Sequence, residues 1–101
     1  MKKFVIERQL PGAGNLSPEE LREIANTSCN VILDLQEPYH WIQTFVTNDK
    51  LFCIHIAESE EVVREHARKG KFPINNVYEV KAVIDPCTRS LKTSKELSLE
   101  V

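Results

Sequence analysis

The sequence predicts one α+β domain in which a four-stranded antiparallel sheet carries two helices on one face. Three observations predict this fold class. They are two segments with helical apolar spacing, an aromatic and β-branched hairpin between them, and a strand-like segment at each end. The chain has 101 residues, the size of a single domain. Residues 1–88 are assigned to that domain and residues 89–101 to a C-terminal tail.

The first part of the domain has the pattern of a strand followed by a long helix. Residues 3–9 alternate as a strand does, and residues 11–15 form a glycine-containing loop. Ser17 is a helix cap, since its side chain can accept a bond from the Glu20 amide while Glu20 reaches back. Helical spacing then continues, and the helix is expected to end before Pro38.

The second part predicts a hairpin, a shorter helix and a last strand. Residues 39–47 and 51–57 are rich in aromatic and β-branched residues, with a tight turn between them. A helix follows, capped by Ser59 and stopped by Gly70, and the last strand is expected near residues 77–84. The resulting order βαββαβ is that of a ferredoxin-like sandwich, with both helices on one face of the sheet.

The hairpin turn decides which side chains share a face. A turn at residues 48–49 pairs Phe45 with Phe52 and Ile42 with His55. The bulkier set is expected to meet the helices: Tyr39, Trp41, Phe45, Phe52, Ile54 and Ile56. The other set is expected on the open face: His40, Ile42, Thr44, Val46, Leu51, Cys53 and His55. A slip of one residue would exchange the two faces.

The open face is expected to be an interface. Ile42, Val46 and Leu51 would leave an apolar patch exposed on a monomer, and such patches mark sites of association. We therefore expect a homodimer that forms through the open sheet face with two-fold symmetry.

Potential metal ligands fall on the same predicted face. His40 lies diagonal to His55, with Cys53 beside them, and Glu7 of the first strand could complete the shell. Imidazole and thiolate favour late first-row metals such as nickel, copper or zinc. Spacing alone favours the alternative, an ordinary sheet face with two histidines and one buried cysteine.

His66 lies on the apolar side of the second predicted helix. A histidine there is more often a core residue with one or two hydrogen bonds. The functional alternative is a metal ligand or a proton carrier at the rim of a cavity.

Composition narrows the classes of protein. The net charge of -2 gives no general attraction to nucleic acid. The apolar run after Met1 is too short for an export signal, and no segment is long enough to cross a membrane, so a cytoplasmic protein is expected. The 3 cysteines are widely spaced without a C-x-x-C pair, and no nucleophile elbow, Walker motif or H-E-x-x-H is present.

Several segments resemble a family of short bacterial proteins, domain of unknown function 4242, which has nickel-binding-protein-like members. The segments are residues 4–8 with 11–13, residues 41–47 with 49–50, residues 64–68 with Gly70, residues 72–73 and the ending at 80–86. The resemblance covers residues 3–88 and implies a ferredoxin-like dimer. It also implies that relatives hold nickel at the dimer surface, and it matches His66 to a histidine on the family's helix.

These observations favour a small cytoplasmic, non-enzymatic protein that buffers or sequesters a transition metal, nickel first. The alternative is a dimeric α+β barrel protein, a small-molecule binder or an oxygenase. Its cavity at the dimer interface would be lined by Ile42, Thr44, His55 and Glu7. A plain dimerisation module is a third possibility.

Overall fold

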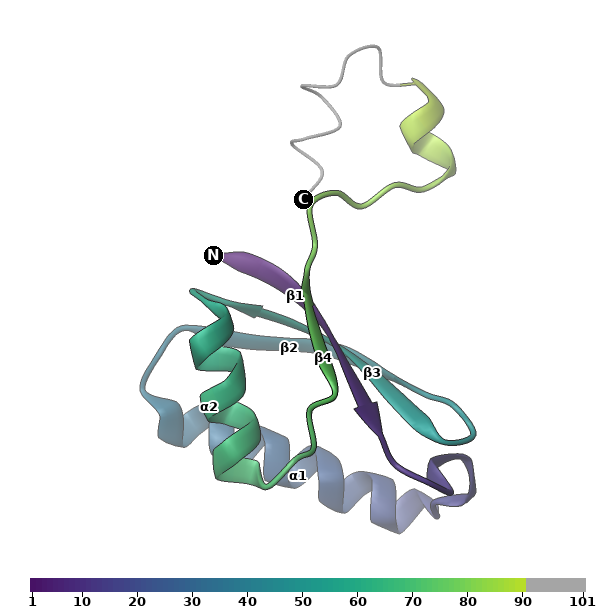
Figure 1. Ribbon diagram of the computed structural model, residues 1–101, viewed down its shortest axis with the longest axis vertical. Coiled ribbons are helices and arrows are strands. Elements are labelled where there is room, and N and C mark those ends of the chain that lie inside the picture. The colour runs from purple at the N-terminus through teal and green to yellow at the C-terminus, as the bar shows by residue number, and fades with distance from the viewer. Residues whose placement is uncertain (91–101) are drawn as a thin grey trace.

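The computed structural model describes residues 1–90 and has the predicted α+β order. Its elements are β1 (Lys2–Gln9), η1 (Ala13–Asn15), α1 (Pro18–Leu35), β2 (Tyr39–Val46), β3 (Lys50–Ala57), α2 (Glu60–Gly70), β4 (Asn76–Glu79) and η2 (Pro86–Ser90). The four strands form one antiparallel sheet in the order β2-β3-β1-β4. Both helices cover the same side of this sheet, as Figure 1 shows. The ferredoxin-like fold is thus confirmed. Most of the predicted tail, residues 91–101, lies outside the described residues.

The two helices begin at the predicted caps. Ser17 Oγ accepts a bond of 3.1 Å from the Glu20 amide, and the Ser17 amide donates to Glu20 Oε1 at 3.0 Å, a complete capping box. Ser59 caps α2 by accepting from the Val62 amide. Gly70 is the last residue of α2, and the left-handed residue after it is Lys71, with φ of 58°.

The hairpin closes as predicted at its turn but not along its whole length. Phe45 pairs with Phe52, while a β-bulge between Trp41 and Gln43 shifts the register beyond that point. Trp41 therefore pairs with His55, where the sequence predicted Ile42.

The predicted faces of β3 are reversed. Leu51, Cys53 and His55 are buried on the helix side, and the bulkier Phe52, Ile54 and Ile56 occupy the open face. The physical reason lies in β1. Phe4 and Ile6 of β1 pair with His55 and Cys53 and have large side chains on the helix side. Because these side chains fill that side, the space beside them suits the less bulky of the two sets of β3 side chains.

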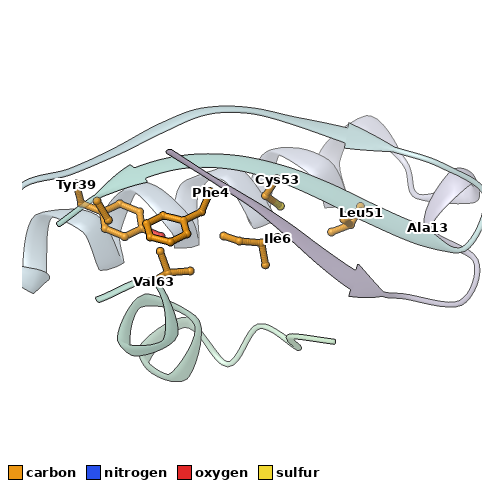
Figure 2. Packing of buried hydrophobic residues seen from close by; sticks show 8 residues of the cluster. Phe4, Ile6, Ala13, Tyr39, Leu51, Cys53 and Val63 are labelled. Carbon is orange, nitrogen blue, oxygen red and sulfur yellow. The ribbon is translucent and has the colours of Figure 1, made fainter. Parts of the chain in front are cut away.

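The core lies between the sheet and the helices. Its buried members are Phe4, Ile6, Ala13, Tyr39, Leu51, Cys53, Ala57 and Val63. Figure 2 shows Val63 reaching from α2 toward Phe4 and Ile6, with Tyr39 beside Phe4. This core fixes the helix side of β2 and β3, and that side carries the site described below.

The last strand is shorter than predicted. The sequence predicted a strand over residues 77–84, whereas β4 covers Asn76–Glu79. The reason is that β1, its partner, begins at Lys2, and the ladder ends with the Val80 amide donating to the Lys3 carbonyl at 2.8 Å. The chain then leaves the sandwich, as Figure 1 shows. Within residues 1–90, no helix is both long and apolar enough to cross a bilayer.

Candidate functional site

The five residues predicted as metal ligands lie on opposite sides of the sheet. Cys53, His55 and His66 are buried on the helix side. His40 and Glu7 lie on the open face, where His40 is exposed and Glu7 is half-buried. The expectation that His40 shares a face with Cys53 and His55 is therefore corrected, because β3 turns its other side to the helices. The role of these residues as metal ligands stays a prediction.

Glu7 is held by neighbours on the open face. Its carboxylate accepts from Lys50 Nζ at 2.9 Å and from the Asn76 amide group at 3.1 Å. The Lys50 hydrogen bond, followed by that of Asn76, lowers the pKa of Glu7 below its ordinary value. Glu7 is therefore an ionised partner of Lys50, remote from the buried histidines.

His55 stands at the centre of the helix side and is only 2% exposed. Its Nδ1 is hydrogen-bonded to the hydroxyl of Tyr39, the first residue of β2. Burial, with smaller contributions from His66 and Arg8, lowers the pKa of His55 to about 3. Burial also raises the pKa of Tyr39, so the hydroxyl stays protonated. It donates a hydrogen bond to the neutral imidazole of His55.

His66 projects from α2 into the same region and is 1% exposed. Its Nε2 lies 3.1 Å from Ser28 Oγ of α1, and its ring stacks on Tyr39 and Phe72 at centroid distances of 4.9 and 5.5 Å. Burial and then Arg8 lower the pKa of His66 to about 4. His66 Nδ1 is a buried polar atom that has no hydrogen-bond partner within residues 1–90.

Arg8 completes the cluster, and the sequence pattern did not lead us to expect it there. It is 2% exposed although it carries a full charge. Its Nε donates to Cys53 Sγ at 3.5 Å and its Nη1 to the Pro73 carbonyl at 2.8 Å, while the guanidinium lies 5.4 Å from the Phe72 ring centroid. Phe4, Ile6 and Arg8 alternate along β1 and point to the same side of the sheet. This alternation is the signal in the sequence that could have predicted the burial of Arg8.

A cavity of about 210 Å³ adjoins this cluster, between α1 and the helix side of β2 and β3. Its lining is Arg8, Leu21, Ile24, Ala25, Ser28, Trp41, Thr44, Val46, Leu51, Cys53, His55, His66 and Phe72. Of the residues predicted to line a ligand cavity, Thr44 and His55 are present. Ile42 and Glu7 lie elsewhere, on the bulge and on the open face. This cavity lies within a single chain, and the cavity predicted at a dimer interface stays a prediction.

The buried cluster does not fit a nickel ion. No group of three His, Cys, Asp or Glu side chains in the described part of the chain is arranged to hold a metal. His55 Nδ1 and His66 Nε2 already have partners, and the guanidinium of Arg8 repels a second cation in a poorly screened interior. The cluster is instead a neutral polar group around one buried positive charge.

The family model that describes the nickel responsive SCO4226-like proteins matches residues 4–80. The chain belongs to the SCO4226-like family. This confirms the nickel-related family predicted from the sequence, while its designation as domain of unknown function 4242 stays a prediction. The matched stretch contains every residue that lines the cavity, so the cavity is part of the SCO4226-like domain.

A solved structure shares the fold. The crystal structure of SCO4226 from Streptomyces coelicolor A3(2) matches with a TM-score of 0.70 at 16% identity, covering 81% of this chain and 99% of that chain. At this identity the match concerns the fold alone. A search of curated proteins finds no match.

Proposed function

We propose that this SCO4226-like protein is a small cytoplasmic, non-enzymatic protein that binds nickel for buffering or sequestration, as a homodimer with metal ligands at its surface. The observation that carries the proposal is the family model for nickel responsive proteins, which matches residues 4–80. The structure adds a constraint on the ligands, since the buried histidines are unsuitable for a cation.

His40 is the histidine that suits a surface site. It is exposed on the open sheet face, opposite Ile56 of β3. Nickel prefers imidazole nitrogen to carbonyl or water oxygen among protein donors. One imidazole is a weak site, but a two-fold interface presents the same patch from both subunits and so supplies two copies of each ligand. We propose that His40 contributes one imidazole from each subunit.

The open face supports the dimer part of this proposal. Phe45 and Tyr78 on this face are 52% and 53% exposed. Half-buried apolar residues lie between them on the same face: Val5, Phe52, Ile54 and Ile56. A continuous apolar surface of this kind is typical of an interface. Its members differ from the predicted set because the face of β3 is reversed.

Calorimetric titration of the full-length protein with nickel, and then with zinc, tests the proposal. We expect nickel to bind with a dissociation constant well below about 1 mM, equivalent to about 4 kcal/mol. His40→Ala should weaken binding at least about tenfold, or about 1.4 kcal/mol. Gln43→Ala, a nearby exposed change on the same strand, is the matched control and should leave it unaltered. Absence of nickel binding, or binding unaffected by His40→Ala, would contradict the proposal.

A further inference from the structure

The cavity behind α1 has the composition of a ligand site with an apolar body and one charged end. Its walls are mainly apolar: Leu21, Ile24, Ala25, Trp41, Val46 and Leu51. Four of its polar members are buried, namely Arg8, Ser28, His55 and His66, and Thr44 is half-buried. They lie together, since the rings of His55 and His66 are 5.2 Å apart, His66 stacks on Phe72, and Arg8 lies over the Phe72 ring. Pockets that combine apolar walls with a few polar groups at one end bind small organic molecules, and the polar groups orient the ligand.

Arg8 sets the sign of the charge that such a ligand would carry. Within residues 1–90, none of the ion pairs involves Arg8, although it is almost fully buried. A buried charge is costly unless an opposite charge or a full set of hydrogen bonds compensates it. The bonds of Arg8 use Nε and Nη1, whereas a guanidinium carries five N–H groups. The unused donors match the two oxygens of a carboxylate.

His66 supplies a second polar contact beside Arg8. When the Ser28 hydroxyl donates to Nε2, the proton of the neutral imidazole resides on Nδ1, the buried atom that has no partner within residues 1–90. That N–H is a donor for a carboxylate oxygen. An unpaired buried donor is rare in folded proteins, and here it belongs to a residue that lines the cavity.

The volume limits the size of the ligand. An apolar cavity of roughly 150 Å³ accommodates benzene in another protein. The cavity here, at about 210 Å³, has room for one ring and a carboxylate substituent. We propose that this cavity binds a small organic carboxylate, with its ring or short chain among the apolar walls and its carboxylate on Arg8 beside His66. This site is independent of the nickel proposal, because it needs no metal and lies on the other face of the sheet.

Binding of benzoate to the full-length protein tests the proposal, with benzamide as the uncharged analogue of the same shape. We expect benzoate to bind at least tenfold more tightly than benzamide, in calorimetry or in ligand-observed NMR. Arg8→Gln should reduce this preference to about twofold or less, while Arg64→Gln, on the exposed side of α2, should leave it unchanged. Ile24→Trp, which fills the cavity but keeps Arg8, should abolish binding of both compounds.

The imidazole signals of the 3 histidines give a second readout, and it needs no variant. Benzoate in the cavity should shift the signals of His55 and His66 and leave that of exposed His40 in place. Equal affinity for benzoate and benzamide would overturn the proposal, as would no benzoate binding or a shift confined to His40. A folded Arg8→Gln variant with the benzoate preference intact would also overturn it.

Discussion

His66 Nε2 lies 3.1 Å from Ser28 Oγ, and this buried hydrogen bond links α2 to α1 across the helix layer. The two residues are 38 positions apart in the chain, so the bond depends on the packing of the finished fold. It also fixes the orientation of the imidazole, whose ring lines the cavity and whose Nδ1 has no hydrogen-bond partner within residues 1–90. The stability of the helix layer and the geometry of the cavity are therefore coupled through one pair.

Removing the serine hydroxyl is expected to destabilise the protein. Ser28→Ala leaves both nitrogens of a buried imidazole unpartnered among residues 1–90, which should cost about 1–3 kcal/mol of the free energy of unfolding. Urea denaturation followed by circular dichroism measures this. Thr27→Ala, the exposed neighbour on α1, is the control and should change stability by less than about 0.5 kcal/mol. Equal stability of Ser28→Ala and Thr27→Ala would show that the bond does not stabilise the helix layer.

Acid should destabilise the fold through the two buried histidines. Their pKa values, about 3 for His55 and about 4 for His66, are lower than the ordinary value of 6.5, so below pH 6.5 the unfolded chain binds more protons than the folded chain. Stability should be fully present above about pH 6.5 and fall toward about pH 4, by about 1.4 kcal/mol per pH unit for each histidine.

Urea denaturation at a series of pH values checks this. His66→Gln should reduce the slope in that range by about half. If His66→Gln left the slope unchanged, groups other than His66 would cause the loss of stability in acid.

Gly70 borders the cavity through Phe72. A methyl group at Gly70 would overlap the Phe72 ring, which forms part of the cavity wall beside Arg8 and His66. Gly70→Ala should therefore cost about 1–3 kcal/mol through overpacking, measured by urea denaturation. In a Phe72→Ala background the same substitution should cost much less, since the overlapping ring is absent. A cost that is equal in both backgrounds would exclude the clash with Phe72 as its cause.

Charge on the open face should dissociate the proposed dimer. Phe45 is 52% exposed on the open face of the edge strand β2 and pairs with Phe52 across the hairpin. Phe45→Glu would place a carboxylate in the interface, so we expect a dimer to become a monomer in analytical ultracentrifugation. Asn48→Glu in the exposed turn is the control and should remain dimeric. A wild-type protein that sediments as a monomer would contradict the dimer directly.

The sequence was sufficient to predict the helices and strands and their order along the chain. The Ser17 capping box, the Phe45–Phe52 pair and the burial of His66 all rest on local spacing, and all appear in the structure. The faces of β3 could not be derived in this way. Which side meets the helices depends on what β1 contributes, and Phe4 and Ile6 already fill that side.

Two features of the site depend on context that spacing does not supply. The bulge at Ile42 moves Trp41 opposite His55, and no local residue pattern indicates it. The burial of Arg8 continues the alternation of its strand, but a charged residue in that position is ordinarily assigned to solvent. Only the fold places Arg8 beside Cys53 and Phe72, where its charge lacks a carboxylate partner within residues 1–90.

The two proposed sites place a metal and an organic anion on opposite faces of the sheet. The most direct measurement is a nickel titration followed by the NMR signals of the three imidazoles, because paramagnetic nickel broadens the signals of nearby nuclei. We expect the signal of His40 to broaden first, while those of His55 and His66 persist. Early broadening of the His55 and His66 signals, with His40 unaffected, would place nickel in the buried cluster and contradict a surface nickel site at His40.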